Sequence, residues 1–203
     1  MFLQSGAPMR RRTGRKPLLM QKTHIRPRKT FGAQGGLCYR CRTSEGRPCP
    51  AATDRERSDP VELTFEQGDF EGARMVRTRV FMEEQGFRNE FDDTDRDERT
   101  VHVTLRVDGE LAGCARIFPD NRPGASGRWI FGRLAVLPDK RGNGLGAALL
   151  AESERLARQA GAAEMRLHAQ CRAEPFYERS GYRSYGPVEM DEHVEHVWMR
   201  KAL

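Results

Sequence analysis

The stretch that decides the fold is Leu134-Ala135-Val136-Leu137-Pro138-Asp139-Lys140-Arg141-Gly142-Asn143-Gly144-Leu145-Gly146. It joins a predicted strand, 129–137, to a segment with leucines at helical spacing, 144–159. Glycines clustered at such a junction let backbone N–H groups point into one concavity, and the helix start adds the positive end of its dipole. The turn therefore suits a phosphate or pyrophosphate, with Arg141 adding a full positive charge. A flexible turn that uses glycine only for packing is the alternative.

Two common nucleotide-binding motifs fit this turn poorly. Gly142-x-Gly144-x-x-Ala147 satisfies a loose dinucleotide fingerprint. However, 138–141 separates the strand from the first glycine, a predicted hairpin precedes the strand, and too little chain follows for a doubly wound sheet. A Walker loop ends in Gly-Lys-Ser/Thr, which Gly146-Ala147-Ala148 lacks. A nicotinamide-dependent enzyme therefore remains only a rival hypothesis.

Hydrophobic periodicity extends the prediction outward from the turn in both directions. The predicted elements are a strand at 61–66, a helix capped by Asp69 and ended by Gly86, an acidic loop at 87–99, a hairpin of 100–107 and 111–118 turning at Asp108-Gly109, a strand at 129–137, a helix at 144–159 stopped by Gly161, a strand at 164–169, a short helix at 173–179, and strands near 182–185 and 194–200. This β-α-β-β-β-α-β-α-β-β order predicts an α/β (α+β) domain over 59–203, with flanking helices on a mixed central sheet of six to seven strands.

Two motifs in the correct order resemble a known superfamily. Arg141-x-x-Gly144-x-Gly146, preceded by Leu134-Ala135-Val136-x-Pro138, resembles the acyl-CoA pyrophosphate loop of the GNAT superfamily of N-acetyltransferases. Phe176-Tyr177-Glu178-Arg179-Ser180-Gly181-Tyr182 resembles its second motif, a short helix that bears a tyrosine. The resemblance spans about 61–203 and includes the element order. Glu83-Glu84-Gln85-Gly86, Leu167-His168-Ala169-Gln170 and His196-Val197-Trp198-Met199 are further similar to a bacterial subgroup, the ElaA/YjcF-like acetyltransferases.

The resemblance implies a GNAT fold that takes acetyl-CoA as co-substrate, uses no metal, and transfers acetyl by direct attack of an amine in a ternary complex. The strand at 129–137 would splay from 164–169 and hydrogen-bond the pantetheine arm, and the glycine-rich turn would hold the pyrophosphate. The implied cofactor-binding residues are Leu134, Ala135, Val136, Arg141, Gly142, Asn143, Gly144, Leu145 and Gly146. A small-molecule or peptide amine is the expected acceptor, and a homodimer is compatible with the superfamily.

The implied catalytic residues are Tyr177, Glu84 and His168. Tyr177 matches the family position of the acid that protonates the departing thiolate, although its ring could simply pack under the cofactor. Glu84 and His168 are candidate bases, with His102 and His196 as further candidates. Each could equally be an ordinary hydrogen-bonded residue, and a water chain could replace a single base. A covalent acyl-enzyme on Cys171 is disfavoured, because the superfamily mostly transfers directly.

Six acids crowd one loop: Glu90, Asp92, Asp93, Asp95, Asp97 and Glu98. The spacing of Asp93, Asp95 and Asp97 starts like a calcium loop, but Glu98 replaces the required glycine. One hypothesis is that this loop borders the acceptor site and favours a cationic amine. An ordinary solvated loop is the alternative.

The net charge of +6 is unevenly distributed along the chain. Residues 1–58 hold 14 Lys and Arg against 3 Asp and Glu, a balance of +11, which leaves −5 for 59–203. The first segment has no hydrophobic period, so a disordered basic tail is expected. Cys38, Cys41 and Cys49 lack a fourth zinc ligand at a recognised spacing. A nucleic-acid-binding protein that uses this tail beside a CoA-sensing domain is the alternative function.

No stretch is long and apolar enough to span a membrane, and no secretory signal is recognisable. The five cysteines form no evident disulfide framework. A cytoplasmic protein is therefore expected.

Overall fold

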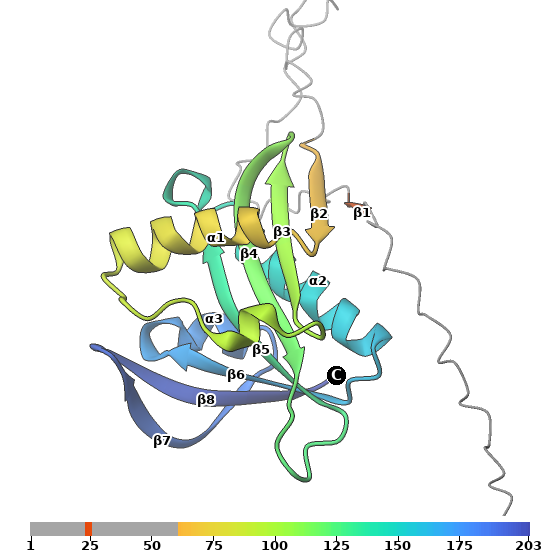
Figure 1. Ribbon diagram of the computed structural model, residues 1–203, viewed down its shortest axis with the longest axis vertical. Coiled ribbons are helices and arrows are strands. Elements are labelled where there is room, and N and C mark those ends of the chain that lie inside the picture. The colour runs from red at the N-terminus through yellow and green to blue at the C-terminus, as the bar shows by residue number, and fades with distance from the viewer. Residues whose placement is uncertain (1–22, 26–60) are drawn as a thin grey trace, which may run out of the picture.

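The computed structural model describes residues 23–25 and 61–203, and one sheet runs through all of this part of the chain (Figure 1). Its strands lie in the order β1-β2-β3-β4-β5-β6-β8-β7. Their bounds are β1 Thr23–Ile25, β2 Leu63–Gln67, β3 Val101–Val107, β4 Glu110–Pro119, β5 Arg128–Val136, β6 Glu164–Gln170, β7 Arg183–Asp191 and β8 Val194–Ala202. Only β5 and β6 pair in parallel, because α2 connects them across the sheet.

Three α-helices flank the sheet: α1 Phe70–Arg77, α2 Leu145–Gln159 and α3 Glu174–Arg179. The predicted α/β class, the mixed sheet with flanking helices and the order of elements from β2 to β8 are confirmed. The zinc-like cysteines Cys38, Cys41 and Cys49 and the rest of the predicted tail, apart from Thr23–Ile25, lie outside the described residues.

Turn and cap residues act as their chemistry predicts. Asp69 precedes α1 and accepts a hydrogen bond from the Gly72 N–H at 2.8 Å. Asp108 and Gly109 join β3 to β4 with φ of 50° and 83°, the left-handed pair that suits a two-residue hairpin. Gly161 follows α2 with φ of 88°.

Two elements differ from the sequence prediction. The helix predicted from Asp69 to Gly86 is α-helical only to Arg77 and continues as a π-helical turn over Thr78–Glu84. The strand expected near 182–185 extends to Asp191, because β7 pairs with β8 again from Val188 to Asp191, after a bulge that follows Tyr185. The strand pairing, rather than the residues of β7 themselves, sets this length.

The two longer helices cover opposite faces of the sheet (Figure 1). Ala73 and Val76 of α1 pack with Cys114 and Ala135 in one buried cluster. The larger cluster, on the α2 side, is formed mainly by alternate residues of β3 to β6, such as Ile117, Phe131, Met165 and Leu167, with Leu149 and Leu150 of α2. The central strands are therefore buried on both faces.

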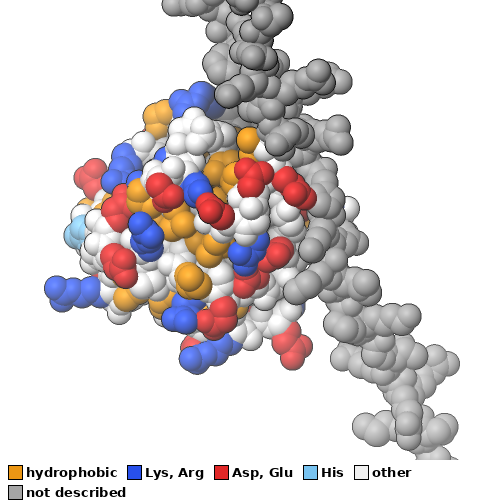
Figure 2. All heavy atoms as spheres, turned by 90° about the horizontal axis from the view of Figure 1, so that it is seen from above, with side chains coloured by type: hydrophobic (Ala, Val, Ile, Leu, Met, Phe, Trp, Pro, Cys, Tyr) orange, Lys and Arg blue, Asp and Glu red, His pale blue; other side chains and the backbone are white. Residues whose placement is uncertain are grey.

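Charges of both signs are interspersed on the surface of the described part of the chain. Figure 2, seen from above Figure 1, shows Lys and Arg side chains alternating with Asp and Glu side chains around exposed apolar ones. None of the helices in 61–203 combines the length and apolar character that a membrane span requires.

Candidate functional site

A wedge opens between β5 and β6. The two strands pair from Arg128 with Glu164 to Phe131 with Leu167, and their pairing stops there although both strands continue. β4 stays paired with β5 on its other side, and β8 stays paired with β6. From residue 132 to 136, β5 therefore has a free edge, where an extended amide-bearing ligand could add as a strand.

A cavity of about 150 Å³ lies at this wedge. On the α2 side of the sheet, its lining residues include Phe131, Leu167 and Tyr177. On the opposite face it is lined by His168, Gln170 and His196, by Asp191-Glu192 beside the β7–β8 turn, and by four residues of the segment after the π-helical turn: Gln85, Phe87, Asn89 and Glu90. Because neighbouring side chains of a strand point to opposite faces, the cavity connects the two faces through the gap between β5 and β6.

The edge of β5 carries one irregularity beside the cavity. Between Cys114 and Arg116 of β4, the partner strand β5 has an extra residue, and Arg133 takes φ of 55°. This β-bulge bends β5 at the point where it leaves β6. Farther along, the Val136 carbonyl accepts a hydrogen bond from Arg141 Nε at 2.9 Å, so the backbone groups of Val136 point away from β4.

The glycine-rich turn leads into α2 and leaves backbone N–H groups without side-chain partners at the start of that helix. Gly142 and Gly144 have φ of 82° and 75°, a conformation that L side chains rarely adopt, and a Cβ at either would meet open space. Gly144 caps α2 without a side-chain hydrogen bond, so the first N–H groups of a 15-residue helix have no side-chain cap. This arrangement fits an anion such as a pyrophosphate.

Arg141 and Glu84, which the sequence assigned to different tasks, contact each other. Arg141 Nη1 and Nη2 donate to the two carboxylate oxygens of Glu84 at 2.8 and 2.7 Å. The hydrogen bond from Arg141 lowers the pKa of Glu84. Glu84 is not among the residues that line the cavity. The ion pair therefore places Glu84 at the mouth of the phosphate turn.

Tyr177 lies where the cavity meets the α2 side. Its side chain is buried, and its ring packs edge-on against Phe131 with centroids 6.4 Å apart. Burial raises the pKa of the phenol. Tyr177 therefore stays protonated at neutral pH and can donate a proton to a group in the cavity.

Two of the predicted histidines meet at the cavity and the third does not. His168 and His196 lie with ring centroids 4.9 Å apart, and Trp198 stacks on His168 at 4.8 Å. Burial, and then the charge of His196, lower the pKa of His168. His102 packs instead against Phe70, with Nε2 3.1 Å from the Asp95 carbonyl.

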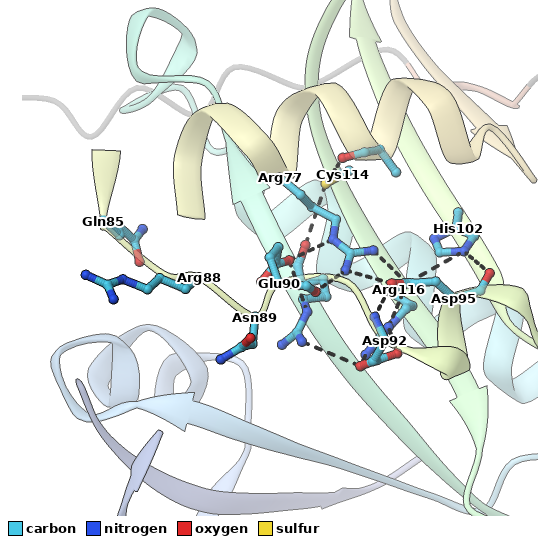
Figure 3. Close-up of polar contacts among 12 residues, drawn as sticks. Arg77, Gln85, Arg88, Asn89, Glu90, Asp92, Asp95, His102, Cys114 and Arg116 are labelled. Atoms are coloured by element: carbon cyan, nitrogen blue, oxygen red, sulfur yellow. Dashed lines mark hydrogen bonds and ion pairs between the residues drawn. The ribbon is translucent and has the colours of Figure 1, made fainter. Parts of the chain in front are cut away.

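The acidic loop is attached to the sheet by arginines (Figure 3). Arg77 of α1, whose side chain is only 1% exposed, donates to Glu90 at 2.7 Å and to Asp95 at 2.6 Å. Arg116 of β4 donates to Asp95 at 2.6 Å and to Asp92 at 2.8 Å.

The loop therefore matches neither sequence hypothesis as a whole. Glu90 lines the cavity, and Asp92 and Asp95 hold the loop in place. Asp93 and Glu98 are exposed, and Asp97 pairs locally with Arg99. The hypothesis that the loop borders the acceptor site did not single out Glu90 from the other acids, because its arginine partners lie on other elements.

Cys171 follows β6 and packs against the core, but it does not line the cavity. Cys114 and Cys171 are both free thiols. In 61–203 no group of three or more His, Cys, Asp or Glu side chains is arranged to hold a metal ion.

Comparison with known proteins assigns a family to this architecture. Residues 67–203 match the model of the acetyltransferase (GNAT) domain. The N-acetyltransferase YjcF of Bacillus subtilis is 31% identical over 134 residues, which cover 62% of this chain and 87% of YjcF.

The fold of this chain is also similar to those of solved structures, including one from Pseudomonas aeruginosa and one from Escherichia coli. An acyl-CoA N-acyltransferase from Pseudomonas aeruginosa superposes with a TM-score of 0.61 and 25% identity, over 70% of this chain and 99% of its own. Escherichia coli ElaA superposes with a TM-score of 0.60 and 20% identity, over 70% of this chain and 99% of its own, and shares the fold. The predicted resemblance is thereby confirmed: the chain belongs to the GNAT family of acyl-CoA-dependent N-acetyltransferases.

Proposed function

We propose that this protein transfers the acetyl group of acetyl-CoA to an amine that attacks the thioester directly, with both substrates bound at once. The observation that carries the proposal is the cavity through the β5–β6 wedge. It allows the thioester to enter from the α2 face and the amine from the other. Direct attack then needs mainly positioning and management of protons.

In this proposal acetyl-CoA is held by backbone more than by side chains. The N–H groups of Gly142, Asn143, Gly144, Leu145 and Gly146 bind the pyrophosphate, with Arg141 beside them. The pantetheine arm pairs with the free edge of β5 through the backbone of Leu134 and Val136. Ala135 lies between them, but its side chain is buried under α1 and its backbone groups face β4, because the Leu137 N–H donates to the Ala112 carbonyl and this direction alternates along the strand.

Tyr177 protonates the departing CoA thiolate. Its position in the cavity lining and its raised pKa support the role of a donor rather than a base. The alternative, in which the ring only packs under the cofactor, predicts that Tyr177→Phe keeps full activity. The acid role predicts a loss of kcat on the order of 10²-fold.

The two predicted bases are in different situations. Glu84 is engaged by Arg141, and its lowered pKa makes it a poor proton acceptor. His168 lines the cavity with a pKa that keeps it neutral. We therefore place the base in the pair of histidines His168 and His196. We assign this activity to the domain at 59–203 and place the protein in the cytoplasm, in keeping with its free thiols.

The test is acetyl-CoA binding by calorimetry with the full chain. Gly144→Glu puts a carboxylate into the phosphate turn and should abolish binding at micromolar protein. Gly161→Glu is the matched control, because Gly161 also has positive φ and open space but lies at the other end of α2. Equal loss in both variants, or binding by Gly144→Glu, would overturn the proposal.

A further inference from the structure

The amine side of the cavity contains two buried side chains that each keep one polar atom free. His196 of β8 is 6% exposed and Glu90 is 4% exposed, and both line the cavity. Polar side chains this deeply buried normally form their hydrogen bonds within the protein. A free acceptor atom on each side chain suggests that a bound ligand donates the missing hydrogen bond.

The tautomer of His196 follows from its single hydrogen bond. Its Nδ1 lies 3.0 Å from the carbonyl oxygen of Val194. A carbonyl only accepts, so Nδ1 carries the proton and the neutral ring leaves a lone pair on Nε2. Nε2 makes no hydrogen bond within 61–203, yet it is not among the fully enclosed polar atoms. It is therefore a free proton acceptor.

Glu90 is bound by one oxygen only. Oε1 accepts a hydrogen bond from Arg77 Nε at 2.7 Å and lies 3.0 Å from Arg133 Nε. Oε2 accepts no hydrogen bond from any residue in the described part of the chain, and it too is absent from the enclosed, unpartnered atoms. Arg77 and Arg133 fix the carboxylate while its second oxygen stays available to a donor.

The charged and titratable groups around His196 favour a cation. The ring of His168 lies 4.9 Å away on β6 in a tilted orientation, and Asp191 and Glu192 line the cavity beside the β7–β8 turn. Arg133 also lines the cavity, but it pairs with Glu90. Glu189 Oε2 lies 3.5 Å from His168 Nε2. Two adjacent histidines disfavour double protonation, so one of them stays available as a base.

We propose that the acceptor is a protonated primary alkylamine, whose ammonium is bound by Glu90 and whose proton is taken by Nε2 of His196. This inference rests on the proposed acetyl transfer. One proton passes from the ammonium to His196, and the free amine nitrogen attacks the thioester carbon. The C–N bond forms and the C–S bond breaks. The thiolate takes a proton from Tyr177, which regains one from the amide nitrogen, and His196 releases its proton to solvent.

The experiment compares two acceptors with the full chain. Cadaverine is an alkylamine that is protonated at neutral pH, whereas 4-methylaniline is already a neutral nucleophile and needs no base. His196→Asn keeps a donor near the position of Nδ1 and removes Nε2. It should lower kcat/KM for cadaverine by about 10²-fold or more, and leave that for 4-methylaniline within about twofold.

Matched variants separate these roles from folding. His193→Asn changes a histidine of the same hairpin that does not line the cavity, and it should retain activity. Glu90→Gln should raise KM for cadaverine about tenfold. Asp95→Asn alters the same arginine network without reaching the cavity and should not raise KM.

The outcomes distinguish the inference from the proposed function. Turnover of 4-methylaniline but not cadaverine by the wild type, or equal losses with both acceptors in His196→Asn, would overturn the inference while acetyl transfer stands. Binding of acetyl-CoA without turnover of either amine would overturn the proposed activity, and the inference with it.

Discussion

The glycine-rich turn 141–146 and the acidic loop 87–99 are both irregular segments, yet they are held in opposite ways. Most of the turn is exposed, and its shape comes from glycines with positive φ at the start of a helix. The loop is rich in charge, but three of its carboxylates, Glu90, Asp92 and Asp95, are paired with arginines of α1, β4 and β5.

This difference distinguishes a feature that a short sequence segment can predict from one that depends on residues far apart in the chain. The turn can be predicted from six consecutive residues, because glycine conformation and helix N–H groups are properties of the segment itself. The loop cannot, since its partners lie as far away as Arg116 and Arg133. A run of acids is usually solvated, and here the arginines change that outcome.

Replacing Arg77 should have the largest effect. Arg77→Met leaves Glu90 with Arg133 and Asp95 with Arg116 as their remaining partners, so the cost should be near the lower end of the about 3–5 kcal/mol for breaking a buried ion pair. The free energy of unfolding in urea measures this cost.

The control is Arg74→Met, one turn earlier on α1. Arg74 pairs with Glu71, and their side chains are 51% and 71% exposed, so its loss should cost at most about 1 kcal/mol. If both variants lose the same stability, the loop is not held by its buried ion pairs.

Most of the fold was predictable because it depends on periodicity and turn chemistry. The hairpin at Asp108-Gly109, the cap at Asp69 and the stop at Gly161 are local signals, and each occurs as expected. The change to a π-helical turn at Thr78 and the extension of β7 to Asp191 were not predictable. No residue pattern within these segments encodes them, and the β7 extension depends on pairing with β8.

The pKa values of two carboxylates in the acidic loop, Asp95 and Glu90, are shifted in opposite directions. Burial opposes ionisation of Asp95, but hydrogen bonds from Arg77 and the charge of Arg116 outweigh it and hold the pKa well below its usual value. Burial raises the pKa of Glu90, despite Arg133 and Arg77. The two carboxylates should therefore contribute to acid stability with opposite signs.

Because the folded pKa of Asp95 is depressed, its stabilisation is complete above about pH 5 and is lost as the pH falls through the folded value. Asp95→Asn should remove on the order of 2 kcal/mol of acid-sensitive stability. Glu90 behaves oppositely, since a raised pKa makes its ionised form unfavourable in the folded state at higher pH. Glu90→Gln should therefore steepen the loss of stability toward acid. Unfolding free energies measured from pH 7 to pH 3 test both signs, and parallel curves for the two variants would contradict them.

The candidate site, like the fold, was predictable only where it depends on local sequence signals. Tyr177 and the glycines belong to contiguous motifs, and the structure places Tyr177 in the cavity lining and Gly142 and Gly144, with positive φ, before α2. His168 was a candidate and lines the cavity, whereas Glu84 meets Arg141 instead. Glu90 and His196 are 106 positions apart by number, and only the folding of the 85–90 segment against the β7–β8 turn brings both to the cavity.

The smallest expected effect concerns Glu84, which joins the two regions through Arg141. Their side chains are 39% and 42% exposed, so Glu84→Gln should change stability by less than about 1 kcal/mol. The substitution removes the negative charge that attracts the Arg141 guanidinium. A pyrophosphate then competes for Arg141 with a neutral amide instead of a carboxylate. Acetyl-CoA should bind more tightly, by up to about tenfold, whereas Arg141→Met should bind it about tenfold more weakly. Calorimetry measures both. If Glu84→Gln weakens binding as much as Arg141→Met, the ion pair positions Arg141 for the cofactor rather than competing with it.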